Sequence, residues 1–130
     1  MAVTITSNKK NTAATIHVAS ANASLVIAGT SSVSSIATGD EVLTGAYITQ
    51  VFFGHDGSSA DGGVAIYRGA NLVAAYDTSC FMDYAGTGMA LTVDQAATLE
   101  IKFVGTNAAY CMLEVQKVGK LTANSVYFQN

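Results

Sequence analysis

The stretch Gly63–Asp77, GVAIYRGANLVAAYD, decides the fold, because it has the pattern of a β-hairpin. Val64 and Ile66 alternate along a first strand, and an apolar second strand begins at Leu72. Between the two strands, the tetrad Arg68–Asn71 interrupts the alternation with a glycine and an asparagine, which tolerate the positive φ of a tight turn better than most residues do. The sequence therefore predicts two antiparallel strands joined by a tight turn.

The other clearly patterned segments are also short strands. Leu99, Ile101 and Phe103 alternate with Glu100 and Lys102, which predicts a strand with one face in the core. No segment shows the sustained 3.6-residue period of an amphipathic helix. About nine strands at this spacing predict an all-β fold, an antiparallel β-sandwich that is jelly-roll-like. The expected strands are Thr12–Val18, Ser24–Ala28, Ala46–Phe53, the two strands of the hairpin, Phe81–Tyr84, Met89–Val93, Thr98–Val104 and Ala109–Val118.

The 130 residues suit one domain, which we place at residues 12–120. Residues 1–11 form an N-terminal arm or short strand, and residues 121–130 form a C-terminal tail. Isolated ends fray, so we expect these apolar ends to dock on a neighbouring subunit, where an end can add as a strand. The alternative is that the tail folds back over its own domain. The expected contact residues are Ala2, Val3, Ile5, Val126, Tyr127 and Phe128.

The composition restricts the classes of function. Only 12% of the residues are charged, against about 25% in an ordinary domain, which favours a subunit that covers much of its surface with copies of itself. The net charge of -3 argues against direct nucleic-acid binding. No apolar run approaches the ~18–20 residues of a membrane helix, and no signal peptide is recognisable, so we expect synthesis in the cytoplasm and no membrane partner.

The loop at residues 54–63 is the best candidate for a ligand site. His55, Asp56 and Asp61 supply an imidazole and two carboxylates, and oxygens of this kind suit Ca²⁺. The loop lacks the alternating Asp and Asn positions and the final Glu of a calcium loop, so a solvated connection between strands is the competing interpretation. A small hydrolase built on His55 with Cys80 or Ser58 is a further hypothesis, although no nucleophile elbow occurs in the chain.

The two cysteines do not form a disulfide framework. Cys111 lies on the same side of its expected strand as Leu113 and Val115, so we predict a buried free thiol. The position of Cys80 stays open, and a Cys80–Cys111 bridge is an alternative. The two cysteines and two histidines lack the spacing of a zinc site, and no phosphate-binding motif appears. We therefore predict no catalytic residue, no cofactor and no metal, so that the chain is not an enzyme.

A carbohydrate-binding module is the alternative function, with the 54–63 loop and nearby tyrosines as its site. Aromatic side chains stack on sugars, although the chain has no tryptophan, and most rings in an all-β protein pack in the core. Tyr67 and Asp61 are the residues at which we expect substitution to abolish glycan binding. The candidate aromatic residues are Tyr47, Phe52, Phe53, Tyr67, Tyr76, Phe81, Tyr84 and Tyr110.

Residues 39–120 resemble the small virion proteins of tailed bacteriophages. The similarity lies in GDEVLTGAYITQVFF (residues 39–53), GGVAIYRGANLVAAY (62–76), GTGMALTVDQAATLEIKFVG (86–105) and AYCMLEVQKVGK (109–120). The resemblance implies a capsid decoration, or cement, protein that stabilises the head by bridging capsid subunits. It also implies a homotrimer on the capsid exterior, with the major capsid protein as its partner. It transfers no functional residue to this chain.

Overall fold

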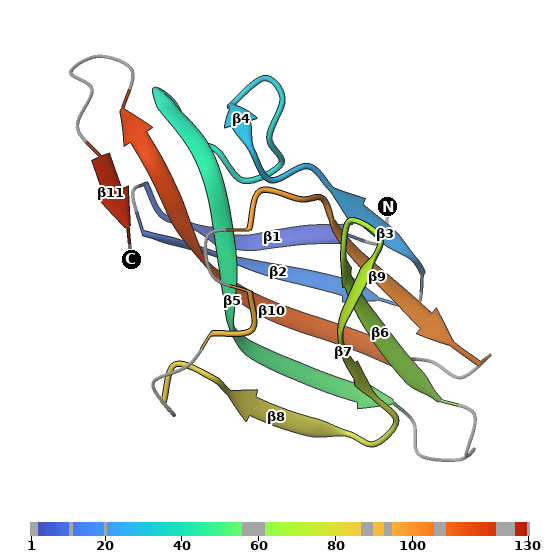
Figure 1. The fold of residues 1–130 in the computed structure, drawn as a ribbon. Coiled ribbons are helices and arrows are strands. Elements are labelled where there is room, and N and C mark those ends of the chain that lie inside the picture. The colour runs from blue at the N-terminus through green and yellow to red at the C-terminus, as the bar shows by residue number, and fades with distance from the viewer. Residues whose placement is uncertain are drawn as a thin grey trace.

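The computed structural model describes residues 3–10, 12–19, 21–55, 62–86, 90–92, 95–105, 109–121 and 127–129. All regular structure in these ranges is β-strand, and Figure 1 shows the strands as two facing layers. The strands are β1 (Val3–Asn8), β2 (Ala13–Ala19), β3 (Ala23–Leu25), β4 (Gly29–Thr30), β5 (Glu41–His55), β6 (Gly63–Arg68), β7 (Asn71–Tyr76), β8 (Cys80–Asp83), β9 (Leu99–Val104), β10 (Ala109–Leu121) and β11 (Tyr127–Gln129).

The strand order is that of a jelly roll. The larger sheet has the order β1-β2-β10-β5, and β4 and β8 both pair with β5. The smaller sheet has the order β3-β9-β6-β7, and every pairing is antiparallel. From β2 to β10 the chain crosses between the two sheets at each step, apart from the short β4 and the β6–β7 hairpin. This connectivity confirms the predicted antiparallel, jelly-roll-like sandwich.

The predicted hairpin is confirmed as β6 and β7. Arg68 pairs with Asn71 across a two-residue turn, and Gly69 takes the positive φ of 61° that the turn requires. The register shifts between Ile66 and Tyr67, because Val73 is an extra residue on β7. The hairpin belongs to the smaller sheet and lies at its edge, so it does not form the centre of the molecule.

The centre is the long pair of β5 and β10. These strands have 15 and 13 residues and stay paired from Ala109 and His55 to Leu121 and Glu41. Thr44 and Thr49 of β5 have no partner in the register, so each marks a β-bulge. Bulges bend a strand and increase its twist, and Figure 1 shows β5 curving strongly along its length. Because of these bends, β5 extends well beyond the expected Ala46–Phe53.

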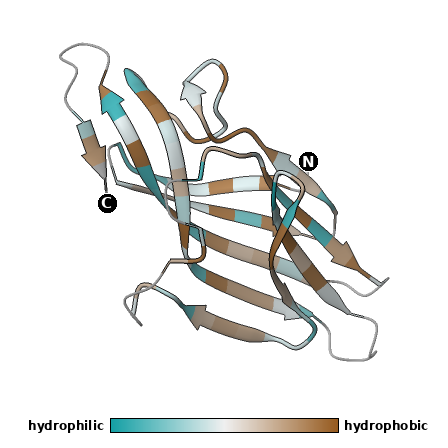
Figure 2. Ribbon diagram, viewed as in Figure 1, coloured by the Kyte–Doolittle hydropathy of each residue, from teal (hydrophilic) through white to brown (hydrophobic). Residues whose placement is uncertain are grey.

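The apolar core lies between the sheets, as the alternation predicted. Inward-facing residues alternate with more polar ones along the strands, which appear as brown and pale bands in Figure 2. Leu99 and Ile101 are fully buried and Phe103 is half-buried. Cys111, Leu113 and Val115 are also fully buried, which confirms Cys111 as a buried free thiol.

Arg68 is buried and joins the two sheets by hydrogen bonds, although the sequence pattern predicted that it lies in a turn. It is 1% exposed at the end of β6. Its guanidinium donates hydrogen bonds to the carbonyl oxygens of Ala46 on β5 (2.8 Å), Ala97 (3.2 Å) and Gln95, and to the hydroxyl of Thr92 (2.9 Å). Burial lowers the pKa of Arg68 to about 10, so the side chain still carries its charge at neutral pH.

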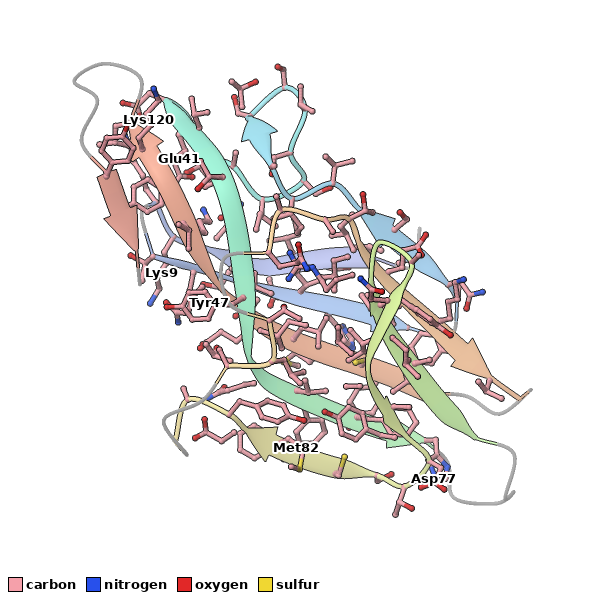
Figure 3. All side chains as sticks on the ribbon, viewed as in Figure 1. Lys9, Glu41, Tyr47, Asp77, Met82 and Lys120 are labelled. Carbon is pink, nitrogen blue, oxygen red and sulfur yellow. The ribbon has the colours of Figure 1, made fainter. Side chains whose placement is uncertain are left out.

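A buried ion pair joins the two central strands near the Glu41 end of β5, close to the Arg68 contact with Ala46. Lys117 continues the inward side of β10, and its Nζ lies 3.0 Å from Oε1 of Glu41 on β5, with both side chains fully buried. The same carboxylate oxygen accepts hydrogen bonds from the backbone N–H and the hydroxyl of Thr38, both at 2.6 Å. Figure 3 shows Glu41 at this end of β5. Such additional bonds are needed to offset the desolvation of a buried pair.

We expect Arg68→Leu to lower the free energy of unfolding by about 3 kcal/mol or more, because one buried and two partly buried carbonyl oxygens lose their donor. Urea denaturation measures the change. Lys9→Leu removes the same charge from an exposed position and is the matched control. If Arg68→Leu unfolds at the same urea concentration as the control, the hydrogen bonds of Arg68 do not stabilise the contact between the sheets.

Candidate functional site

The larger sheet carries exposed aromatic and methionine side chains on its outer face. Phe81 pairs with Phe52, Phe52 with Met112, and Met112 with His17, so these residues form one row across β8, β5, β10 and β2. Tyr110 lies two residues from Met112 on the same face of β10. Phe81 is 54% exposed, Phe52 41%, and Met112 and Tyr110 are each 37% exposed. We call His17, Phe52, Phe81, Tyr110 and Met112 the aromatic face.

The rings of the aromatic face are in mutual contact. The Phe52 and Tyr110 rings are nearly parallel, at 15°, with their centroids 5.8 Å apart. The Phe81 ring lies 6.1 Å from that of Phe52, and the His17 ring meets Tyr110 edge-on at 5.7 Å. These separations are those of favourable aromatic pairs, so the rings hold one another in place.

Gly54 allows Tyr110 to lie across β5. A Cβ at this position would be only 2.7 Å from Cε1 and Cζ of the Tyr110 ring. Any larger residue would push the ring outward and disturb its parallel packing on Phe52. The sequence thus provides a flat aromatic surface by placing a glycine beside an exposed phenylalanine on β5 and a tyrosine on the neighbouring strand.

A cleft of about 360 Å³ opens beside these rings, between β5, β8 and β10. Its apolar wall includes Phe52, Phe81 and Tyr110, and its polar groups include His55 and Ser79. The hydroxyl of Ser79 accepts a hydrogen bond from the backbone N–H of His55 at 3.2 Å. The volume falls within the ~300–1,000 Å³ that is typical of small-molecule sites, which are mostly apolar with a few polar groups.

Of the described residues in the predicted 54–63 loop, Gly54 and His55 line the cleft. His55 is the last residue of β5, and its ring packs 5.6 Å from that of Phe53. Asp56, Ser58 and Asp61 lie outside the described residues. The described residues contain no group of three or more His, Cys, Asp or Glu side chains placed to hold a metal ion.

Neither cysteine has the properties of a nucleophile. Cys80 and Cys111 are both free thiols, and Phe53 of β5 pairs with each of them from either side. Two strand spacings of ~4.8 Å separate them, which is too far for the bridge that the sequence left open. Burial raises the pKa of both thiols, that of Cys111 to about 12, whereas an activated cysteine has a lowered pKa.

Among the tyrosines named as glycan candidates, Tyr110 belongs to the aromatic face, whereas Tyr67 and Tyr76 lie on the smaller sheet. The Tyr67 ring is covered by the Lys102 ammonium group, 4.9 Å from its centroid. The Tyr76 and Tyr84 hydroxyls share a 2.5 Å hydrogen bond, and burial followed by this bond raises the pKa of Tyr76. Phe52 and Phe81 were predicted only as two of eight candidate aromatic residues. The adjacent Phe52 and Phe53 were a usable signal, because neighbouring strand residues face opposite sides.

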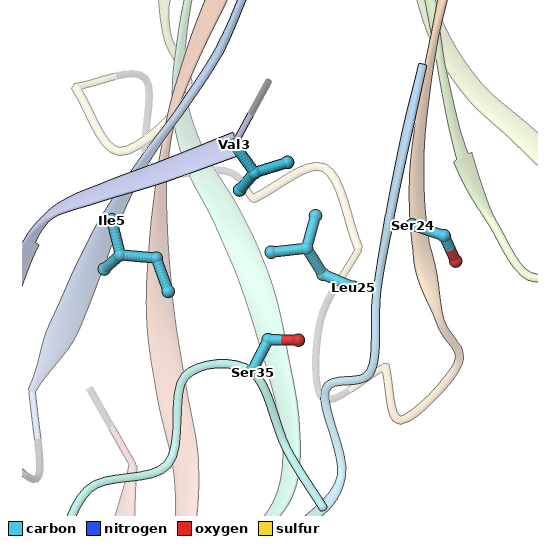
Figure 4. A pocket seen from close by; sticks show the side chains of 5 residues that line it. All are labelled: Val3, Ile5, Ser24, Leu25 and Ser35. Atoms are coloured by element: carbon cyan, nitrogen blue, oxygen red, sulfur yellow. The ribbon is translucent and has the colours of Figure 1, made fainter. Parts of the chain in front are cut away.

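A second candidate site lies at the open edge of the sandwich. Val3 and Ile5 of β1 and Leu25 of β3 converge on an apolar groove of about 360 Å³ that Ser35 also lines (Figure 4). β1 and β3 are the first strands in the orders of their sheets, and no described segment pairs with the outer edge of β1. The groove therefore lies between the edge strands of the two sheets, on the side where no described strand continues either sheet.

The sequence of β1 gives its edge little protection. Val3–Asn8, VTITSN, has no charged residue and no proline, and its one irregularity is a register shift between Ile5 and Ser7. Natural edge strands are usually guarded by charges, proline or bulges, because a free edge accepts another strand. Of these guards β1 has only the irregularity at Thr6, so the rest of its edge is open to strand addition.

The expected contact residues at the C-terminal end lie partly in a short strand of the same chain. Tyr127 and Phe128 lie in β11, which pairs with Val118–Lys120 of the same chain. Tyr127 is 75% exposed, whereas Phe128 packs partly against the core. Ala2 and Val126 lie outside the described residues.

Comparisons of the chain with protein-family models, with curated proteins and with solved structures found no match. Within the described ranges, no helix is long and apolar enough to cross a membrane.

We expect at most one thiol, that of Cys80, to react with a disulfide reagent in the native protein at mildly alkaline pH, and both to react after unfolding in guanidinium. Cys111 is buried and its pKa is raised to about 12, whereas an ordinary cysteine has a pKa of 9.0. Thiol titration with and without denaturant measures this difference. Rapid reaction of two thiols in the native state would contradict the burial of Cys111.

Proposed function

We propose that this chain is a non-enzymatic structural protein of a bacteriophage particle. In its most specific form, it is a capsid decoration (cement) protein that forms a homotrimer on the outside of the head and bridges subunits of the major capsid protein. The resemblance of residues 39–120 to small virion proteins suggests the particle. The observation that carries the assembly role is the uncharged β1 edge with an apolar groove beside it.

The groove suggests how one subunit holds the next. An extended segment of a second copy would add beside β1, where its backbone groups would bond the free edge. An apolar side chain of that segment would then enter the groove between Val3, Ile5 and Leu25. In a trimer each such contact joins two different surfaces, so the ring closes without leaving an unused β1 edge.

The low charge of the chain supports the same role. A chain with only 12% charged residues offers few ion pairs, so stable attachment has to come from several small interfaces acting together. Three subunits that bind one shell gain from avidity, because each bound subunit raises the effective concentration of the next. This is a mechanical function, and it needs no catalytic group.

We expect Thr4→Lys/Thr6→Lys to convert the trimer to a monomer, because both side chains are exposed on β1 and lysine protects an edge strand from pairing. Solution mass by light scattering measures the change. Thr44→Lys/Val104→Lys adds the same charge at exposed positions on β5 and β9 and should leave the trimer intact. A wild-type protein that remains monomeric at all accessible concentrations would contradict the proposed self-assembly.

A further inference from the structure

We propose that the aromatic face and its cleft bind a neutral saccharide, in addition to the assembly role of the β1 edge. The first argument is the exposed apolar surface. Phe52, Phe81 and Tyr110 come from three different strands, yet their rings lie within 6.1 Å of their neighbours and stay open to solvent. Aromatic faces attract the partly positive C–H groups of a sugar ring, and they bury its apolar side without needing charge.

The second argument is a polar row directly beside the aromatic one. Gln50 of β5 pairs with Asp83 of β8 and with Glu114 of β10. Each of these residues is two positions from Phe52, Phe81 or Met112 on its own strand, so both rows face outward. The rows are ~6.7 Å apart along the strands, within the span of a sugar ring and its hydroxyl groups.

The polar row offers mainly acceptors. The Glu114 carboxylate already accepts hydrogen bonds from the Thr49 hydroxyl (2.9 Å) and the Gln116 amide (3.4 Å), so it is held in place. Asp83 is similarly fixed by a 2.9 Å bond from the backbone N–H of Gly86. Fixed carboxylates can accept hydrogen bonds from sugar hydroxyls, whereas they repel an anionic sugar. The predicted ligand is therefore a neutral hexopyranose chain, and sialylated or uronic-acid glycans are excluded.

The third argument is the shape of the surface. The cleft of about 360 Å³ borders Phe52, Phe81 and Tyr110, and His55 and Ser79 provide further polar groups at its wall. The polar row lies on the opposite side of the rings from this cleft, so a small amphipathic ligand stacked on the rings meets polar groups on both sides.

The test is an NMR titration of the full chain with neutral oligosaccharides of glucose, galactose, mannose and N-acetylglucosamine. We expect at least one of them to shift signals of Phe52 and Tyr110 and to leave Leu72, which is 57% exposed on the other sheet, unchanged. Phe52→Ala should weaken binding about tenfold through the loss of one stacking ring. Leu72→Ala is the matched control and should bind as wild type does.

Further variants keep the proposal testable if Phe52→Ala disturbs folding. Phe81 is 54% exposed on an edge strand, so Phe81→Ala should fold and still lose affinity. Thr4→Lys/Thr6→Lys should keep sugar binding, which separates this site from the assembly edge. The proposal is overturned if none of the four sugar classes shifts these signals, if Phe81→Ala and Phe52→Ala bind as wild type does, or if only anionic sugars bind. It is also overturned if Phe52→Ala abolishes self-association while no sugar binds, because the face is then a protein interface.

Discussion

The hydrogen bonds of Arg68 are the constraint on which the arrangement of the two sheets depends. A guanidinium at the end of β6 can be buried only if its donors find acceptors, and it finds them on β5 and on the segment that leads into β9. The turn after β6 must therefore stay close to Ala46, which fixes the hairpin of the smaller sheet against the central strand of the larger one. The buried Lys117–Glu41 pair joins β10 to β5 on the Glu41 side of Ala46 and so supports the same region of the two sheets.

Periodicity was enough to predict the fold class. The alternation in Leu99–Phe103 and Cys111–Val115 correctly separated the buried face of each strand from the outer one, and the Gly69 turn marked the hairpin. The burial of the two inward-facing charged residues was not predicted. Arg68 and Lys117 look like surface residues in a sequence, because the acceptors that make their burial possible lie far away along the chain. The predicted bounds of β5 stopped short of the Thr44 bulge and of Glu41, and those of β10 ended three residues before Leu121.

The candidate site was harder to predict than the fold. The aromatic face combines residues of four strands, and their register depends on pairings that no single segment reveals. His55 was expected at a ligand site and does line the cleft, whereas Tyr67 lies on the other sheet. Composition indicated that many rings were available, but only the strand register separates those that pack in the core from those that face outward.

The two proposed sites use different properties of the same sheet. The β1 edge provides unpaired backbone groups, and the outer face between β2 and β8 provides rings and fixed carboxylates. A subunit built in this way can attach to its neighbours through an edge and keep one face of the sheet open to the surroundings. β1 has no charged residue, whereas Asp83 and Glu114 lie beside the exposed rings, as the two proposed roles require.

Amide hydrogen exchange of β1 at low and high protein concentration tests the central claim most directly. If β1 is the assembly edge, the backbone amides of Val3–Asn8 that point away from β2 should exchange more slowly as the oligomer forms, and those of the β10 interior should stay equally protected throughout. Exchange of the β1 amides that does not change with concentration, while the solution mass rises, would contradict the account, because the subunits would then associate through another surface.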